Sequence, residues 1–443
     1  MKTQWLVRKR WLAIGLSIML WVTAGAQADA VLDSITRAAD RLVEQQHTDL
    51  PFVGRWPNEG QYTGSIVPGL VCAYQITGDE AYRVSAELGG DYILASAPGG
   101  NYYGDEAYTL ARLSAIDPCD PCDNHWRDVL TGFYQWISDD PCGGTPAYIG
   151  WFTTVNPSTA VYYLAHHVVA AYYVEADDRA IWRASLISYL SEVADDTADY
   201  PVLSMGVATW ALAQTGSGLD STPVRLPGSG QPYWNGVVLA DLPGLLAGHQ
   251  ASSCEPYPGS FFWRFAHDDG DPWPEYPVSG FTEDLSFSVL GLVAAAQAGS
   301  SPGGGFAVHT ARGVLPYGVY GDGKVYEHIW LGGFQYNYYA GAILRALCAL
   351  SPSEIPPLEI PLCWGASTQC HGDVDDDCDV DTVDWPLFRD AFGSAYPAPQ
   401  YNPCADLDRD GDVDTVDWPD FRDNFGGAVA DDCTPGGTWP PAL

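Results

Sequence analysis

The residues with the clearest chemistry are aspartates that alternate along two short segments near the carboxyl end of the chain. Segments 379–393 and 412–426 differ at two positions of fifteen and are offset by 33 residues. A twelve-residue loop that presents oxygen ligands at positions 1, 3, 5, 7, 9 and 12 binds one Ca²⁺. The sequence therefore predicts two calcium ions, one in each loop. The predicted ligands are Asp373, Asp375, Asp377, Asp379 and Asp384 in the first loop, and Asp406, Asp408, Asp410, Asp412 and Asp417 in the second.

The positions within each predicted loop are not equivalent. Position 7 contributes a backbone carbonyl and position 9 often acts through a water molecule. The side chains expected to be weaker direct ligands are Asp379, Asp381, Asp412 and Asp414. The turn position that is Gly411 in the second loop is Cys378 in the first, where a residue other than glycine is strained. We expect the first loop to bind calcium more weakly, or Cys378 to form a disulfide bond, with Cys404 as one partner.

Each predicted calcium loop is followed by one predicted helix. Trp385-Pro386 and Trp418-Pro419 begin these helices, because proline is tolerated in a first helical turn. The apolar stripe at i, i+4 consists of Phe388, Phe392, Phe421 and Phe425. A merely solvated acidic tail would not repeat aromatic residues at fixed offsets.

Paired loops closed by aspartate, each with a single helix, resemble a type I dockerin, and the resemblance covers residues 371–433. It implies a small, α-helical, calcium-folded docking module with a cohesin-like protein as its partner. In that family the residues before the closing aspartate help to recognise the partner. The corresponding residues here are Thr382, Val383, Thr415 and Val416.

The amino-terminal residues are typical of a secretory signal. Basic residues precede an apolar run from Trp11 to Ala26, and small residues continue to Ala28. The run is about 16 residues long, shorter than the ~20 that a membrane-spanning helix needs. We therefore expect residues 1–28 to be removed and the protein to be secreted, with no membrane span. A net charge of −36 makes nucleic acid and anionic membranes poor partners.

The 11 cysteines of an exported chain are expected to form mostly disulfide bonds. An odd number leaves one thiol free or intermolecular, and the sequence does not fix the pairing. Cys119, Cys122 and Cys142 are close enough in sequence for part of a zinc site, with His125 as the nearest fourth ligand. Local disulfide bonds remain the favoured interpretation because the predicted compartment is oxidising.

Residues 29–352 are expected to form a domain of helical repeats. Segments rich in small and apolar residues recur at intervals of about 33 to 53 residues, a period typical of helical repeats. They begin near Tyr62, Asp105, Ser158, Pro201, Trp234, Phe281 and Phe334. Some predicted helices end in glutamine before a glycine–aromatic turn, as at Gln45-Gln46, Gln250 and Gln297. Glycine is expected to end the helix and the aromatic residue to pack the turn.

These repeats resemble the α/α toroids, in which helical hairpins close into a ring of inner and outer helices. They are similar to the repeats of prenyltransferases and squalene cyclases, and the ring resembles six-hairpin glycoside hydrolases and some polysaccharide lyases. The resemblance implies a mainly α fold. A proline-rich linker, residues 353–370, is expected to separate this domain from the dockerin-like module, and residues 434–443 form a tail.

Dockerins most often tether carbohydrate-active enzymes, so the resemblance implies a glycoside hydrolase or polysaccharide lyase that acts on polysaccharide or oligosaccharide. Hydrolysis usually needs two carboxylates that flank the bond. The candidates at expected starts of inner helices are Asp105, Glu106, Glu283 and Asp284, and Glu59 and Glu327-His328 occupy similar positions. Helix capping and the helix dipole would also favour acidic residues in a first turn.

Other interpretations of the helical domain remain open. A non-catalytic toroid that binds glycan or protein, tethered by the dockerin, is the main alternative. The segment from Asp195 to Asp199 matches an Asp-Asp-x-x-Asp diphosphate motif weakly, and the loop from His267 to Asp271 is acidic enough to hold calcium or sugar. His166-His167 lies among apolar residues, so at least one of the two histidines is expected to pack in the core.

Overall fold

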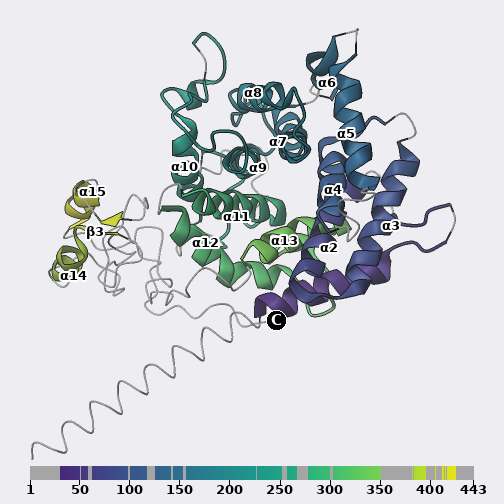
Figure 1. Ribbon diagram of the computed structural model, residues 1–443. Coiled ribbons are helices and arrows are strands. Elements are labelled where there is room, and N and C mark those ends of the chain that lie inside the picture. The colour runs from purple at the N-terminus through teal and green to yellow at the C-terminus, as the bar shows by residue number, and fades with distance from the viewer. Residues whose placement is uncertain are drawn as a thin grey trace, which may run out of the picture.

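The computed structural model describes a mainly helical protein, as the sequence predicts (Figure 1). None of the helices in its described part is long and apolar enough to cross a membrane. The described residues are 30–49, 51–57, 62–97, 100–116, 125–140, 143–152, 156–225, 227–251, 257–266, 278–299, 303–350, 382, 384–395, 405, 412–413, 415 and 417–425.

One set of helices packs in a cyclic order, in which each helix contacts the next and the last contacts the first. In chain order they are α2 (Thr63–Thr77), α4 (Gly104–Ser114), α7 (Pro157–Tyr173), α9 (Pro201–Ala213), α11 (Thr282–Gln297) and α13 (Asn337–Ala349). Their starts lie within three residues of predicted repeat starts. The predicted start at Trp234 is wrong, because Trp234 ends a short 3₁₀ helix, η2 (Pro232–Trp234). Its buried indole nitrogen donates to the carbonyl of Val193 at 2.8 Å and so fixes a loop rather than a long helix.

The helices of this cyclic set approach one another closely because glycines lie at their contacts. A side-chain carbon on Gly104 of α4 would lie 1.9 Å from the carbonyl oxygen of Tyr163 on α7. One on Gly341 of α13 would lie 2.4 Å from the carbonyl oxygen of Ser65 on α2. Larger residues would therefore push these backbones apart, and glycine is the residue that permits such an approach.

A second set of helices packs outside the first. Residues 30–45 form the first of these helices. The others are α3 (Glu80–Ser96), α5 (His125–Ser138), α6 (Gly144–Phe152), α8 (Arg179–Leu190), α10 (Leu242–Gly248) and α12 (Gly303–Val314). The short elements between them are η3 (Leu239–Asp241), η4 (Leu315–Gly318) and the hairpin of β1 (Tyr326–His328) and β2 (Gly332–Gln335). The two sets share one hydrophobic core, which runs from Val31 to Leu350.

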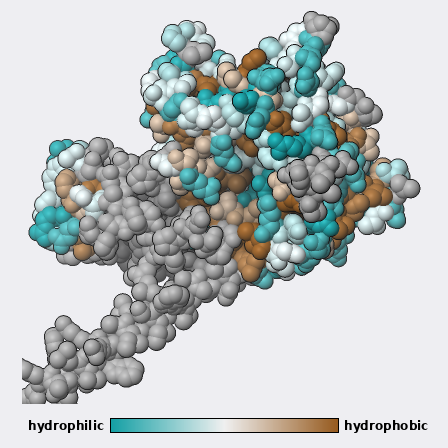
Figure 2. Space-filling view, viewed as in Figure 1, coloured by the Kyte–Doolittle hydropathy of each residue, from teal (hydrophilic) through white to brown (hydrophobic). Residues whose placement is uncertain are grey.

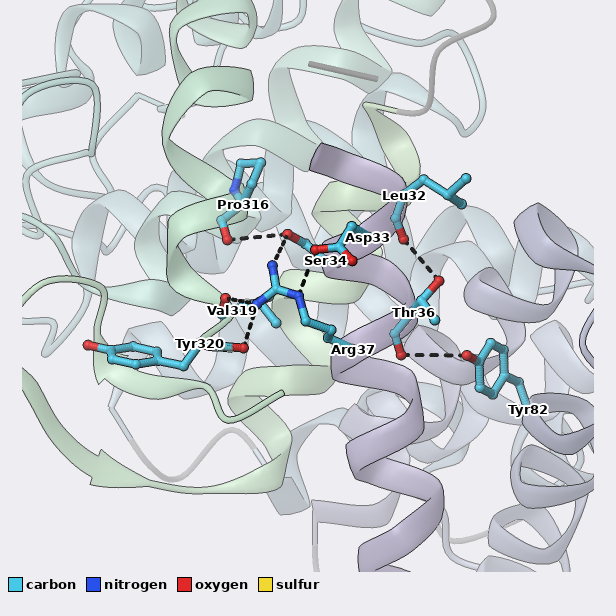
Figure 3. A network of polar contacts seen from close by, with 9 residues as sticks. All are labelled: Leu32, Asp33, Ser34, Thr36, Arg37, Tyr82, Pro316, Val319 and Tyr320. Carbon is cyan, nitrogen blue, oxygen red and sulfur yellow. Dashed lines mark hydrogen bonds and ion pairs between the residues drawn. The ribbon is translucent and has the colours of Figure 1, made fainter. Parts of the chain in front are cut away.

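The helix of residues 30–45 is hydrogen-bonded to residues 316–320, far along the chain (Figure 3). The Arg37 guanidinium donates to the carbonyl oxygens of Val319 and Tyr320 at 2.8 and 2.6 Å. The Ser34 hydroxyl donates to the carbonyl of Pro316 at 3.3 Å. Contacts across 282 residues of chain therefore hold the first described helix against the segment that precedes the β-hairpin.

The glutamine turns have the same hydrogen bonds at two places. The Gln46 amide donates to the carbonyls of Gly54 and Ser85, both at 2.9 Å. The Gln250 amide donates to the carbonyls of Gly259 and Ala307, both at 3.0 Å. Each glutamine thus ties a glycine turn to the following outer helix. Gln297 also ends a helix, but its side chain is exposed.

The carboxyl-terminal residues form two short helices, as predicted: α14 (Asp384–Ala391) and α15 (Asp417–Asn424). The strands β3 (Ser394–Ala395) and β4 (Asp412–Val413) pair antiparallel. Equivalent residues of the two repeats stack on each other, Phe388 on Phe421 with ring centres 4.5 Å apart. Both are buried, whereas Phe392 and Phe425 are each 44% exposed, so only half of the predicted apolar stripe enters the small core.

Candidate functional site

The predicted carboxylates lie in the first turns of α4 and α11. The charges of both groups act on Tyr162 of α7. Burial raises the pKa of Tyr162 well above its usual range, and the charges of Asp105 and Glu283 raise it further. The Ser65 hydroxyl therefore connects Tyr162 to Asp105, and the charge of Glu283, 178 positions from Asp105 in the sequence, also acts on Tyr162.

Asp105 is only 3% exposed. The Ser65 hydroxyl donates to its Oδ2 at 2.8 Å, and the hydroxyls of Ser65 and Tyr162 are 3.0 Å apart. Burial raises the pKa of Asp105 to about 6, although hydrogen bonds from Ser65 and from the backbone of its own helix start lower it. Near neutral pH this carboxyl group is therefore mostly ionised, in a site with little water.

Glu106 is half-buried beside Asp105. Its carboxylate accepts a hydrogen bond from the backbone N–H of Tyr103 at 2.9 Å, which satisfies one of the free donors at the start of α4. Burial and then the charge of Asp105 raise the pKa of Glu106 to about 8. Glu106 therefore has a capping function that accounts for its position without catalysis.

Glu283 is half-buried at the start of α11. Burial raises its pKa to about 7, and the charge of Glu327 adds to this rise. Glu327 reaches the site from the β1–β2 hairpin. The Thr282 hydroxyl, which donates to the carbonyl of Tyr326 at 2.6 Å, holds that hairpin against the start of α11. Glu327 therefore raises the pKa of Glu283 only while the hairpin stays in place against α11.

Gly280 and His328 also hold the β1–β2 hairpin against the segment that precedes α11. The His328 Nε2 donates to the carbonyl of Ser279 at 2.9 Å, and its Nδ1 accepts from the backbone N–H of Leu331 at 3.0 Å. A side-chain carbon on Gly280 would lie 2.4 Å from that Nε2. Burial lowers the pKa of His328. His328 is therefore a neutral residue that shapes the hairpin, and Glu327 is the residue of this pair that faces the acidic site.

Asp284 differs from its neighbour Glu283. It is 2% exposed, and its Oδ1 accepts a hydrogen bond from the backbone N–H of Leu203 at 3.2 Å. Burial, and then the charge of Glu283, raises its pKa well above the usual range. Asp284 thus links the first turns of α9 and α11 and is covered by protein.

A row of stacked aromatic rings approaches the carboxylates from the β-hairpin. Phe334 stacks on Tyr336 with ring centres 6.1 Å apart, and Tyr336 stacks on Tyr338 at 5.4 Å. Tyr338 then contacts Tyr62 at 4.7 Å, and the charge of Glu283 adds to the effect of burial on the pKa of Tyr338. Phe334 is 63% exposed, so this hairpin arm runs from solvent to the carboxylates.

A second row of rings lies beside α4 and α6. Tyr163 contacts Tyr103 with ring centres 5.1 Å apart, and Tyr103 stacks on Trp151 at 5.6 Å. Trp151 is 51% exposed. Figure 2 shows apolar residues scattered among polar ones over the visible face of the helical domain. Both rows therefore end in an exposed ring.

The main buried cation near the site is Arg345 on α13. Its Nη1 donates to the Nε2 of His166 at 2.8 Å, and the His166 Nδ1 donates to the carbonyl of Tyr162 at 2.8 Å. Its guanidinium lies over the rings of Tyr108 and Trp210 at 4.9 and 4.8 Å. Burial lowers the pKa of His166 far below its usual range. His166 and His167 are both buried, so the prediction that at least one packs in the core is confirmed.

The remaining sequence motifs have other positions. Both carboxylate oxygens of Asp195 accept backbone hydrogen bonds at 2.7 Å, from Phe265 and Ala266, and Asp199 bonds Asn156. The segment that resembles a diphosphate motif, residues 195–199, therefore connects its own loop to residues 265–266 and to Asn156. Among the residues that the structure describes, there is no group of three or more possible metal ligands. Outside the described residues lie Glu59, the loop 267–271, Cys119, Cys122, Cys142, Cys378, Cys404, Val383, Val416 and the calcium-loop aspartates other than Asp384, Asp412 and Asp417.

Sequence reasoning missed several residues of the site. Ser65, Tyr162 and Tyr338 bear no local motif, although the run Tyr336-Asn-Tyr-Tyr339 at a predicted repeat start was a usable signal. Comparison with known proteins finds no match, either to a protein-family model or to a curated protein.

Proposed function

We propose that residues 29–352 form an α/α toroid that hydrolyses glycosidic bonds in an uncharged polysaccharide. The observation that carries this proposal is that the charges of Asp105 and Glu283, from opposite members of the cyclic helix set, both raise the pKa of Tyr162, and that two rows of aromatic rings lie near these residues. The cyclic contacts of α2, α4, α7, α9, α11 and α13, with outer helices packed around them, support the toroid.

In the proposed reaction Glu283 is the general acid. With a pKa of about 7 it retains a proton at neutral pH, and it donates that proton to the oxygen of the leaving sugar. Asp105, with a pKa of about 6, is ionised and serves as the base or nucleophile of the pair. Two carboxyl groups whose environments separate their pKa values are the usual pattern of such an acid–base pair. Asp284 has a positioning role, because Leu203 binds it.

The charges of the site favour hydrolysis of a neutral polymer over lyase chemistry. A lyase needs a cation to neutralise the uronate carboxylate. Asp105, which is ionised, and Glu327, whose charge acts on Glu283, instead place negative charge here, and an anionic polymer would be repelled. Arg345 is 5% exposed and already donates to His166, so it lies beneath the site.

A non-catalytic glycan-binding domain is the second candidate, and the two aromatic rows favour it independently of the carboxylates. The test is incubation of the purified full-length protein with neutral and uronate-containing polysaccharides. New reducing ends without the ultraviolet absorbance of an unsaturated uronate support hydrolysis, and that absorbance would identify a lyase. Binding without any product would favour the second candidate.

Matched variants connect that activity to the site. Glu283→Gln and Asp105→Asn keep the size of each side chain and remove its titration. Glu44→Gln removes a carboxylate from the exposed face of the helix 30–45, where Glu44 pairs with Arg41, and is the control. Activity lost in the two site variants and kept in the control is the expected result.

We also propose that residues 371–433 are a dockerin-type module that folds around two calcium ions and binds a cohesin-like protein. The stacking of Phe388 on Phe421 and of Trp385 against Trp418 relates the two repeats by an approximate two-fold symmetry. Thr382 and Thr415 are both exposed beside the helix starts, as a docking face requires. The test is calorimetric titration of the metal-free protein with Ca²⁺, with two bound ions per chain as the expected result.

A further inference from the structure

Two cysteines meet where the cyclic helix set closes. Cys72 lies on α2 and Cys348 on α13, the first and last helices of that set. Their thiols lie within hydrogen-bonding reach of each other. Cys72 is half-buried and Cys348 is buried.

The packing of α2 against α13 accounts for this meeting. A side-chain carbon on Gly69 would lie 2.8 Å from the carbonyl of Gly341 and 3.0 Å from Cβ of Leu344. One on Gly341 would meet the backbone of Ser65. The two helices therefore run in the same direction with backbones in contact. Cys72 lies about one turn after Gly69, and Cys348 lies about one turn after Leu344. The two cysteines are therefore at the same height along the paired helices.

We propose that Cys72 and Cys348 form a disulfide bond that covalently joins the first and last helices of the cyclic set. Each thiol loses its proton, the two sulfurs together give up two electrons, and one S–S bond forms. A protein or glutathione disulfide of the compartment to which the chain is exported accepts the electrons and becomes two thiols. The bond spans 276 positions of sequence, so it constrains a large loop of the unfolded chain.

The surroundings of the two thiols support this reaction. The hydrogen bond from Cys348 lowers the pKa of Cys72, and the positive charge of Arg112 lowers it further. Burial raises the pKa of Cys348 far above its usual range. Cys72 is therefore the thiol that ionises and attacks the oxidant, and Cys348 then resolves the mixed disulfide.

The bond would also bear on the site. Ser65, which donates to Asp105, lies on the same helix as Cys72. Tyr338 and Tyr339 lie on the same helix as Cys348. Joining α2 to α13 therefore keeps the Ser65 hydroxyl and the hairpin arm of rings in register. The proposal itself does not depend on the chemistry of that site.

Peptide mapping of the secreted, full-length protein tests the proposal without any variant. The protein is denatured without reductant, alkylated, digested and analysed by mass spectrometry. We expect one peptide pair that contains Cys72 and Cys348 and separates on reduction. Recovery of both cysteines in alkylated form, or of either joined to a different cysteine, would overturn the proposal.

A variant cycle adds an independent measurement. Cys72→Ser, Cys348→Ser and the double variant are compared by thermal unfolding, with and without reductant. Loss of a disulfide predicts that each single variant lowers Tm by about 5 °C or more, and that the double variant lowers it no further. A wild-type protein whose Tm falls on reduction by no more than that of the double variant would contradict the bond.

Discussion

The charge of Glu327 should set the alkaline limit of activity through Glu283. The structure raises the pKa of Glu283 from 4.5 to about 7, with burial as the larger cause and Glu327 as the smaller. Glu327 therefore supplies less than half of a rise of about 2.5, so Glu327→Gln should lower the pKa of Glu283 by at most about 1. A general acid works only while protonated, so the alkaline limb of the pH profile must move to lower pH.

The assay is the pH dependence of kcat/KM on a neutral polysaccharide, which reports the groups of the free enzyme. Activity should rise as Asp105 ionises near pH 6 and fall as Glu283 ionises near pH 7. In Glu327→Gln the acid limb should stay in place, and the alkaline limb should move to lower pH by a few tenths to about 1 pH unit. Glu44→Gln should shift neither limb. An alkaline limb that stays or moves to higher pH in Glu327→Gln would refute the assignment of Glu283 as the acid.

Three further predictions follow from the same geometry. Glu283→Gln and Asp105→Asn should each lower kcat by about 10²–10⁴-fold with little change in Tm, measured by initial rates and thermal unfolding. Trp151→Ala and Phe334→Ala, whose rings are 51% and 63% exposed, should each weaken binding of a long oligosaccharide roughly two- to tenfold in calorimetry, and should leave a short one unaffected. Removal of calcium by a chelator should expose the carboxyl-terminal module to protease, because a module that folds around its metal ions loses its fold without them.

Much of the fold was predictable because it depends on local patterns. Small and apolar residues recur along the chain, and the predicted repeat starts match α2, α4, α7, α9, α11 and α13. Gln46 and Gln250 were also recognisable, since each must satisfy the backbone of a glycine turn that lies a few residues away. The prediction of a helix start at Trp234 was wrong, because the local composition around an aromatic residue that fixes a loop resembles that around one that starts a helix.

The site was only half predictable, because its members come from distant parts of the chain. Asp105 and Glu283 could be selected as acidic residues at helix starts. Nothing near either residue in sequence indicates that the charges of both act on Tyr162, or that the charge of Glu327 acts on Glu283. Those relations exist only once the helices pack together.

The two adjacent acidic residues of α11 illustrate why side-chain geometry, rather than residue type, decides function here. Glu283 and Asp284 differ by one methylene and by about 100° around the helix axis. That rotation turns Asp284 toward the backbone N–H of Leu203, where burial and a hydrogen bond fix it. The charge of Glu283 acts on Tyr338 and Tyr339 instead, and Glu283 remains partly exposed. The exposed part of Glu283 leaves it able to exchange a proton with solvent, whereas Asp284 is buried in the contact between two helices.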